Sequence, residues 1–311
     1  MKNFSDFVSV AALLVLFGYI SFNEIRHRSQ PQRISDESVA GMQFVLEDGP
    51  SPAVSLSVPE RLTFAGEPVP LDMPDVYERL DKELQINTYF HSNTLFLIKR
   101  ANRWLPQIEE ILRKNDVPED FKYLPLIESN LLNDISPKNA VGYWQILKAA
   151  GKENGLEINN EVDERYDPLK ATEAACRYLK TAYRKFGNWT LVAASYNRGM
   201  SGMQRALDNQ KVDSYYDLYL NEETSRYVFR ILAIKEIIEN PLKYGFRVNP
   251  KHLYQEEPLR YIEVDETIRD LVQFAKQHNV NYKQIKRYNP WLRDEKLTVK
   301  RGQQYRIALP E

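Results

Sequence analysis

The feature that most constrains the fold is helical periodicity, which runs from residue 74 to residue 245 without convincing strand alternation. Its clearest instance begins at Asp167, a residue type that caps helices, with Pro168 in the first helical position. Apolar residues then recur at steps of three and four until Gly187, which favours the end of a helix. This pattern predicts a mainly α fold, with an all-helical domain over residues 74–247.

The same spacing predicts further helices inside this region. Two of them cover residues 189–197 and 222–239. Another is short: Pro118 is placed to open it, and its apolar residues lead toward Glu128. Pro106 lies inside an earlier helical pattern, where a ring without an N–H should kink the helix or start a new one.

The N-terminal part of the chain is different in character. Lys2 precedes an apolar run over residues 8–20, which suits a signal peptide better than a full membrane span of about 20 residues. We expect residues 1–24 to be a signal peptide or an uncleaved signal anchor, so the chain is exported. Residues 25–73 are rich in Ser, Pro, Gln and acidic side chains, which predicts a disordered linker.

Residues 255–311 change from helical periodicity to a mixed pattern. Tyr261–Val264 alternates like a strand, and Tyr305–Leu309 supplies a closing strand. Two short helical patterns lie between them, and Asp265 and Thr267 are placed to cap the first. The predicted order is therefore strand, helix, helix, strand.

This C-terminal unit resembles a LysM domain, a small βααβ fold that binds glycan. The resemblance rests on Val264–Ile268 at the start, Asn289–Leu292 at a turn and Ala308–Pro310 at the end. LysM domains usually have Gly-Asp-Thr-Leu at the start and Ile-Pro at the end, so both of these segments depart from the family pattern. The resemblance implies a glycan-binding module.

Composition excludes several classes of function. The formal net charge is −1, from 42 basic and 43 acidic side chains, without the basic excess that nucleic acid requires. Cys176 is the one cysteine, so no intramolecular disulfide can form, and the 4 histidines show no metal-ligand spacing. We expect no metal, no other cofactor and no nucleic-acid partner.

One carboxylate is placed where it can act as an acid. Glu128 follows the apolar pair Leu126–Ile127, and a glutamate among apolar neighbours keeps its proton near neutral pH. Burial against these residues, Tyr143 and Tyr196 should raise its pKa, and Arg198 is the nearby cation expected to oppose this. The amides and hydroxyls of Gln145, Tyr196 and Asn197 can hold the polar groups of a sugar.

These blocks, in this order, resemble the lysozyme-like SLT family 1 domain of the lytic murein transglycosylases, nearest the membrane-bound type D branch. The matching segments are Glu128–Ser129, Ser136–Pro137, Ala140–Gln145, Ser195–Gly199 and Glu223–Val228. The resemblance implies that Glu128 is the catalytic acid/base. It also implies substrate contacts from Ser129, Ser136, Gly142, Tyr143, Trp144, Gln145, Tyr196, Asn197, Glu223 and Tyr227, with Tyr143 and Trp144 forming an aromatic wall.

The resemblance further implies an activity and a place. Enzymes of this family cleave the β-1,4 bond between N-acetylmuramic acid and N-acetylglucosamine and form a 1,6-anhydromuramic acid end without consuming water. The expected partner is the peptidoglycan glycan strand, in the periplasm, with membrane contact through the N-terminal segment.

Two other functions are consistent with the same residues. A muramidase on the same fold would use water, and a non-catalytic scaffold would only bind peptidoglycan. Most glycosidases use two carboxylates. Asp134, Asp163 and Glu164 follow Glu128 without a matching motif, and Asp167 is explained as a helix cap. The absence of a matching second acid favours transglycosylation.

Overall fold

The structure is a computed structural model that describes residues 54–311. The expected signal segment at residues 1–24 and most of the expected linker lie outside the described residues. Within residues 54–311, no helix combines the length and the apolar character that a bilayer span needs.

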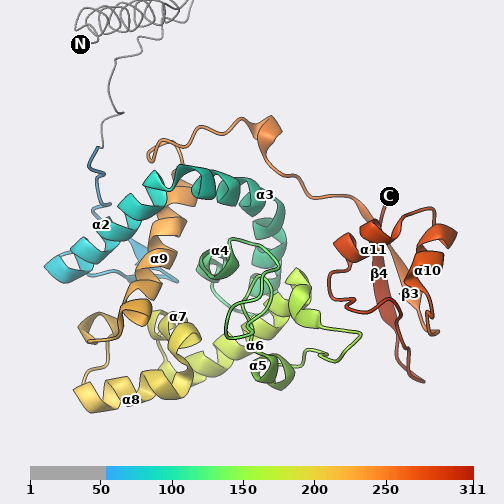
Figure 1. Cartoon of the computed structure of the whole chain (residues 1–311). Coiled ribbons are helices and arrows are strands. Elements are labelled where there is room, and N and C mark those ends of the chain that lie inside the picture. The colour runs from blue at the N-terminus through green and yellow to red at the C-terminus, as the bar shows by residue number, and fades with distance from the viewer. Residues whose placement is uncertain (1–53) are drawn as a thin grey trace, which may run out of the picture. The chain divides into compact units, whose positions relative to one another are not determined.

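The helical domain is built around one central helix (Figure 1). Its elements, in chain order, are β1 (Thr63–Phe64), β2 (Glu67–Pro68), α2 (Pro74–Tyr89), α3 (His91–Lys114), a 3-10 helix (Glu119–Tyr123), α4 (Leu124–Ser129), α5 (Lys148–Glu153), a 3-10 helix (Glu164–Tyr166), α6 (Pro168–Phe186), α7 (Trp189–Arg198), α8 (Met200–Gln210), a 3-10 helix (Tyr215–Asp217) and α9 (Glu222–Glu239). The central helix is α9, against which α2, α4 and α7 pack.

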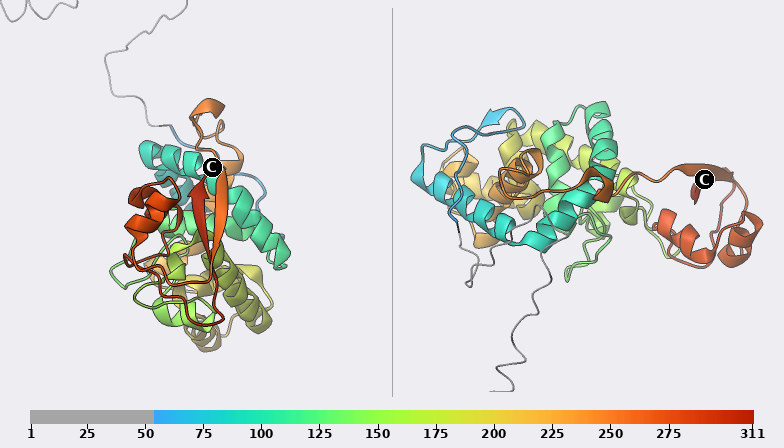
Figure 2. Two further views of the ribbon diagram at one scale, coloured as in Figure 1. Left: turned by 90° about the vertical axis from the view of Figure 1, so that its right-hand side faces the viewer. Right: turned by 90° about the horizontal axis from the view of Figure 1, so that it is seen from above.

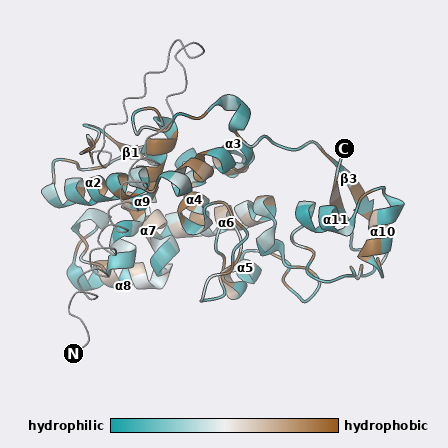
Figure 3. Ribbon diagram, turned by 45° about the horizontal axis from the view of Figure 1, so that its top comes forward, coloured by the Kyte–Doolittle hydropathy of each residue, from teal (hydrophilic) through white to brown (hydrophobic). Residues whose placement is uncertain are grey.

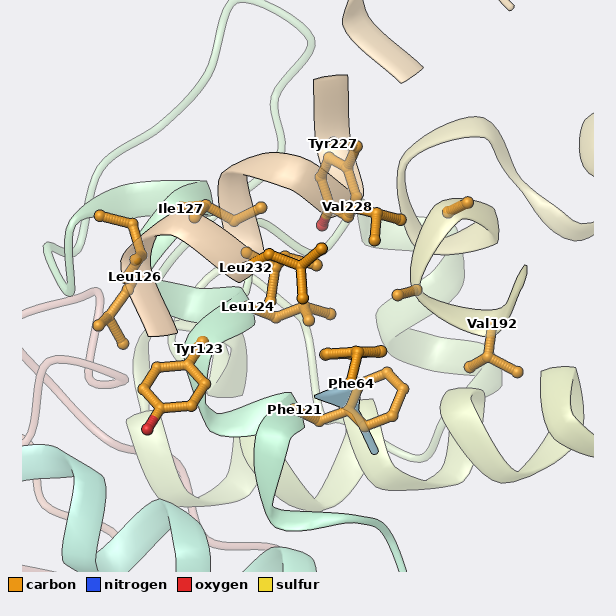
Figure 4. Packing of buried hydrophobic residues seen from close by; sticks show 14 of the residues in the cluster. Phe64, Phe121, Tyr123, Leu124, Leu126, Ile127, Val192, Tyr227, Val228 and Leu232 are labelled. Carbon is orange, nitrogen blue, oxygen red and sulfur yellow. The ribbon is translucent and has the colours of Figure 1, made fainter. Parts of the chain in front are cut away.

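Helix α9 is a largely buried support of this domain. Val228, Ile231 and Leu232 are fully buried, and Figure 3 shows the hydrophobic colour along α9 while α2 and α8 are largely hydrophilic. Figure 4 shows Leu124 of α4 and Leu232 of α9 within one packed cluster. The short helix that carries Glu128 is therefore anchored on the core and not on the surface.

The helix ends agree with the sequence patterns. Asp167 accepts hydrogen bonds from the backbone N–H groups of Leu169 and Lys170 at 2.9 and 3.1 Å, which caps α6. Gly187 ends α6 with a φ of +63°. The helices predicted at 189–197 and 222–239 are confirmed, with α7 one residue longer than expected.

The bend predicted at Pro106 agrees with the structure, whereas the helix start predicted at Pro118 needs correction. Helix α3 continues through Pro106 and bends (Figure 1), because the buried face formed by Leu105 and Ile108 keeps both halves packed on the core. Pro118 does not open an α-helix; it precedes the 3-10 helix, and α4 begins only at Leu124, with Pro125 in its first turn.

Residues 54–73 are ordered, which corrects the C-terminal end of the predicted linker. Phe64 in the β1–β2 hairpin is fully buried and meets Phe121 edge to face, with ring centroids 5.2 Å apart. The carboxylate of Glu67 accepts the backbone N–H groups of Trp189 and Thr190 at 2.6 and 2.9 Å, which adds a cap to α7. The prolines in this segment led to the prediction of a disordered linker. Proline is, however, also compatible with a short edge strand, as in this hairpin.

The C-terminal domain has the predicted βααβ order. It consists of β3 (Leu259–Val264), α10 (Leu271–Gln277), α11 (Tyr282–Tyr288) and β4 (Tyr305–Pro310). The two strands are antiparallel, with Tyr261 opposite Ala308, and Figure 2 shows them side by side. A core that includes Leu271, Ile285 and Leu292 holds the helices on this ribbon.

The start of α10 differs from the prediction. Asp270 caps this helix by accepting the N–H groups of Val272 and Gln273 at 2.8 and 3.1 Å. The expected capping residues, Asp265 and Thr267, lie before a bridge between Ile268 and Leu297. That bridge keeps the chain extended for longer than propensity indicates, so the helix begins later.

Candidate active site

Glu128 lies at the C-terminal end of α4, where the chain leaves the core. Leu126 and Ile127 are buried, whereas Glu128 is partly exposed. The helix ends at Asn130, which adopts a left-handed conformation with a φ of 53°. The phenol of Tyr227, on α9, donates a hydrogen bond to Oε1 of Glu128. Two elements 99 residues apart in sequence thus fix one carboxyl group.

Burial dominates the electrostatics of this carboxyl. It raises the pKa of Glu128 above the ordinary value, as the sequence predicts, while the hydrogen bond from Tyr227 and the charge of Arg230 lower the pKa. The charge of Glu223 raises it further. Burial also raises the pKa of the Tyr227 and Tyr196 hydroxyls well above 10, so both groups keep their protons.

Arg230 is the cation at this site, in place of the expected Arg198. Its guanidinium donates a hydrogen bond of 2.7 Å to the carbonyl oxygen of Ile127, next to Glu128. Arg198 instead donates to the carbonyl oxygen of Gly202. The signal for Arg230 was present in the sequence, since it follows Tyr227 by three residues and so shares a helix face with it.

Residues 133–146 form an irregular loop that carries Ser136 and Gln145, two of the predicted substrate contacts, and we call it the substrate loop. Gln145 has a φ of 47°, and its side-chain amide donates to the carbonyl oxygens of Asp134 and Gly142 at 3.1 and 3.0 Å. The hydroxyl of Ser136 accepts the N–H of Ala140 at 3.0 Å. Side chains predicted to contact substrate thus also fold the loop.

Gly142 is required by a close approach between two backbones. Its φ is +79°, and a Cβ at this position would lie 2.0 Å from the carbonyl oxygen of Arg165. No side chain fits in that space without moving the backbone. The match of Gly142 to a sequence motif therefore has a packing reason in addition to any substrate contact.

Two of the residues expected to contact substrate are buried and bonded within the protein. Trp144 is fully buried and its indole N–H donates to the hydroxyl of Thr172 at 2.8 Å, so it belongs to the core and forms no aromatic wall. Ser129 is buried, and its hydroxyl donates to the carbonyl oxygen of Tyr143 at 2.9 Å. An indole N–H needs a partner when buried, and Thr172 supplies one.

The aromatic residues beside Trp144 connect the loop to the helices. Tyr143 is 8% exposed and meets Trp104 of α3 edge to face, with centroids 5.3 Å apart. The hydroxyl of Tyr196, on α7, donates to the carbonyl oxygen of Trp144 at 2.7 Å. Both phenols therefore position the loop.

Asn197, near the end of α7, and Glu223, at the start of α9, are directly connected. The amide nitrogen of Asn197 donates to Glu223 Oε1 at 3.0 Å, and its amide oxygen accepts from the Thr224 hydroxyl at 2.8 Å. These two bonds fix the orientation of the amide. Asn197 is partly exposed and Glu223 is exposed, so both can meet a ligand.

Among residues 54–311, no cluster of His, Cys, Asp and Glu has the arrangement of a metal site. The chemistry available here is that of a carboxyl group with a raised pKa, protonated phenols, oriented amides and one guanidinium. Such a set can donate and accept a proton at an oxygen atom and can bind a polyhydroxylated ligand.

Two family models match parts of this chain. Residues 106–218 match the family model of the transglycosylase SLT domain, and residues 260–311 match the soluble lytic transglycosylase C-terminal LysM-like domain. This chain carries an SLT domain and a LysM-like domain. The SLT match includes Glu128, Gln145 and Asn197.

Two curated relatives are also similar to this chain. The membrane-bound lytic murein transglycosylases D of Escherichia coli strains K12 and O6:H1 are each 30% identical to the chain over 194 residues. The match covers 60% of this chain and 42% of the relatives, so the chain spans less than half of their length.

A solved structure of an inactive mutant of the lytic transglycosylase Slt from Pseudomonas aeruginosa is 16% identical, with a TM-score of 0.36. That match covers 49% of this chain and 26% of the solved one. A likeness at this level supports no conclusion about the site.

Proposed function

We propose that this chain is a peptidoglycan lytic transglycosylase, which cleaves the β-1,4 bond between N-acetylmuramic acid and N-acetylglucosamine. The observation that carries the proposal is the state of Glu128. Burial keeps its carboxyl protonated to a higher pH than usual, because it raises the pKa, and the Tyr227 hydroxyl fixes its orientation. The SLT match over this region supports the same substrate.

In the proposed reaction, Glu128 gives its proton to the glycosidic oxygen while the bond from the anomeric carbon to that oxygen breaks. The carbonyl oxygen of the muramic acid N-acetyl group meets the positive charge that develops at the anomeric carbon. The 6-hydroxyl of the same sugar then attacks this carbon and gives its proton to the Glu128 carboxylate. The product is a 1,6-anhydro ring, Glu128 ends protonated, and no water is consumed.

Tyr227 also selects the oxygen that carries the acid proton. Its hydroxyl donates to Oε1 of Glu128, which is therefore the acceptor oxygen of the carboxyl group. We assign the acid proton to Oε2, the atom expected to face the leaving oxygen. Arg230, bonded to the Ile127 carbonyl, stabilises the carboxylate that forms once the proton has left.

The polar groups around Glu128 are assigned to the sugar. Asn197 presents an amide that Glu223 and Thr224 hold in one orientation, and the substrate loop with Ser136 and Gln145 forms the facing wall. Ser129 and Trp144 act on the substrate indirectly, because both are buried and hold the substrate loop.

The muramidase alternative has one observation in its favour. The charge of Glu223 is near enough to raise the pKa of Glu128, so the site does contain a second carboxylate. In an inverting hydrolase such a group would activate water. Its hydrogen bond from Asn197 ties it to orienting an amide, so we favour the transglycosylase.

The proposed substrate also indicates where the protein works. Peptidoglycan lies in the bacterial cell envelope, so we place the chain in the periplasm, and the curated relatives are described as membrane-bound. We propose that residues 1–24 export the chain and hold it near the membrane, and that the LysM-like domain contributes glycan binding.

The decisive experiment is digestion of purified sacculi in water enriched with oxygen-18, with mass spectrometry of the released muropeptides. A transglycosylase releases anhydro products, one water lighter and without label. Labelled reducing ends would establish a muramidase instead. Release of nothing by the wild type, with retained binding, would support the scaffold. Glu128→Gln is the matched control, because it keeps the shape of the side chain and removes the proton.

A further inference from the structure

A segment of the helical domain belongs to the core of the LysM-like domain. Residues 157–166, between α5 and α6, form what we call the bridging segment. Val162 is 1% exposed and lies in the hydrophobic cluster of the LysM-like domain, with Leu292 and Leu297. It also pairs with Leu292 through an isolated β-bridge.

Polar contacts flank Val162 on both sides. The Glu161 carboxylate accepts the backbone N–H and the hydroxyl of Thr298 at 2.6 and 3.1 Å and pairs with Lys296 at 3.2 Å. The N–H of Asp163 donates to the Trp291 carbonyl oxygen at 2.9 Å. The contact is therefore a mixed apolar and polar interface, not a loose tether.

The same segment holds the substrate loop. Arg165 and Asp163 are each 7% exposed and form a two-point ion pair, with bonds of 2.9 and 2.7 Å. The remaining nitrogen of the Arg165 guanidinium donates to the carbonyl oxygens of Asn139 and Ile146 at 3.2 and 3.1 Å. Both carbonyls belong to the substrate loop, between Ser136 and the start of α5.

A second attachment of the LysM-like domain to the helical domain involves residues 254–257, just before β3. Glu257, just before β3, pairs with Arg103 of α3 at 3.2 Å and with Arg287 of α11 at 2.5 Å. In the same segment, the carbonyl oxygen of Tyr254 accepts a hydrogen bond from the Asn102 side chain of α3 at 3.0 Å. The carbonyl oxygen of Gln255 accepts one from Arg103 at 2.8 Å. The domain is thus held at two separate places.

We propose that the LysM-like domain is a positioning part of the catalytic site: docked on Val162, it fixes the bridging segment, and Arg165 in turn fixes the substrate loop. Arg165 and Val162 are positioning residues, because neither reaches Glu128 or the substrate. This inference rests on the proposed function and adds to it that a domain expected only to recruit glycan also controls turnover.

Physical reasons make this coupling strong. The Asp163–Arg165 pair is removed from water, so it tolerates little displacement without leaving a charge unpaired. Gly142, in the substrate loop, lies against the Arg165 backbone with no space for even a Cβ. Movement of the bridging segment must therefore move the loop, and a misplacement of about 1 Å can cost about 10²-fold in rate.

The test uses full-length Val162→Lys, which places a charge in the docking core. Val272→Lys is the matched control, since Val272 is 43% exposed on the same LysM-like domain and lies outside its hydrophobic cluster. Val162→Ile is the conservative variant. Turnover is measured on a short soluble glycan, which needs no recruitment to a sacculus, together with hydrogen exchange at the backbone amides of Val141 and Ile146.

We expect Val162→Lys to lower kcat about tenfold or more on the soluble glycan, with faster exchange at both amides. Val272→Lys and Val162→Ile should match the wild type. Unchanged kcat and exchange in Val162→Lys would overturn the inference. An inactive wild type would instead count against the proposed function, so the two failures are distinguishable.

Glu161→Ala guards against a folding defect, because it removes contacts to Thr298 and Lys296 without altering either core. Exchange at the β3 and β4 amides verifies that the LysM-like domain stays folded. A smaller fall in kcat with faster loop exchange is expected. If Glu161→Ala lowers only turnover on sacculi, the domain recruits substrate and positions nothing.

Discussion

Glu128 and Gln145 are both assigned to the proposed site, but they lie on backbones of different kinds. Glu128 is carried by α4, which is anchored on the buried face of α9, and α9 also supplies Tyr227 and Arg230. Gln145 lies in an irregular loop that its own side chain helps to close. The acid is thus held by helix packing, and the loop by hydrogen bonds to carbonyl oxygens.

The two backbones should respond differently to substitution. A packed helix pair resists local change. Substitutions beside Glu128 should therefore change the pKa of its carboxyl group more than they change its position. The substrate loop depends on a few backbone contacts, so a single added atom can displace it. Variants of the two regions should therefore differ in whether they shift the pH profile or lower turnover at all pH values.

The largest effect is expected for Glu128→Gln. Loss of the proton donor should reduce turnover of glycan strands by about 10²- to 10⁴-fold, with binding retained. Release of soluble muropeptides from sacculi measures the change. Glu239→Gln is the control, because Glu239 also accepts a hydrogen bond from a tyrosine, Tyr123, at 3.0 Å. Retained turnover in Glu128→Gln would place the acid elsewhere.

Gly142→Ala should have the next largest effect, through the loop. The added Cβ meets the Arg165 carbonyl oxygen at 2.0 Å, and the positive φ alone costs about 1–2 kcal/mol. Turnover should fall by about 10²-fold at every pH. Gly66→Ala is the control, since Gly66 has a φ of +81° and open space around it. Equal losses in both variants would attribute the effect to φ and not to the close approach.

Tyr227→Phe should act mainly on protonation. The lost hydrogen bond lowers the pKa of Glu128 in the wild type, so its removal raises that pKa further. Glu128 then keeps its proton to higher pH, and the alkaline limb of the kcat/KM profile moves to higher pH. Turnover itself should fall about tenfold as the carboxyl loses its orientation. Tyr123→Phe, which removes the bond to Glu239, should leave the profile in place.

The smallest effect is expected for Glu223→Gln. The charge of Glu223 raises the pKa of Glu128, so neutralising it should lower that pKa and move the alkaline limb to lower pH. Turnover at the optimum should change by only about threefold, because an amide can still accept the Asn197 hydrogen bond. Glu222→Gln, the adjacent exposed residue, is the control. A loss near 10²-fold would identify Glu223 as a second catalytic carboxylate, as a muramidase requires.

Local sequence signals explain why so much of the fold was predictable. The Asp167 cap, the Gly187 end and the bounds of α9 depend on local chemistry that the sequence states directly. The raised pKa of Glu128 depends equally on its apolar neighbours. These features involve residues that are close in sequence or share one periodic face.

What could not be predicted depends on partners distant in sequence. The sequence predicts Trp144 in an aromatic wall, because nothing near it in sequence indicates that Thr172 accepts its N–H. The docking of Val162 joins segments that no periodic pattern connects. The substrate loop has several residues at positive φ, Asn139 and Gln145 among them, and non-glycine residues give little warning of this conformation.

The β1–β2 hairpin belongs to the helical domain as a structural unit. Glu67 completes the N-terminal cap of α7, whose other end carries Asn197, and Phe64 fills space beside Phe121. A gene fusion that joined this domain to a new partner at residue 74 would leave a cavity of phenylalanine size, typically costing about 3–5 kcal/mol. Recombination should therefore preserve the hairpin with the helices, so the evolutionary unit begins before the first helix of the domain.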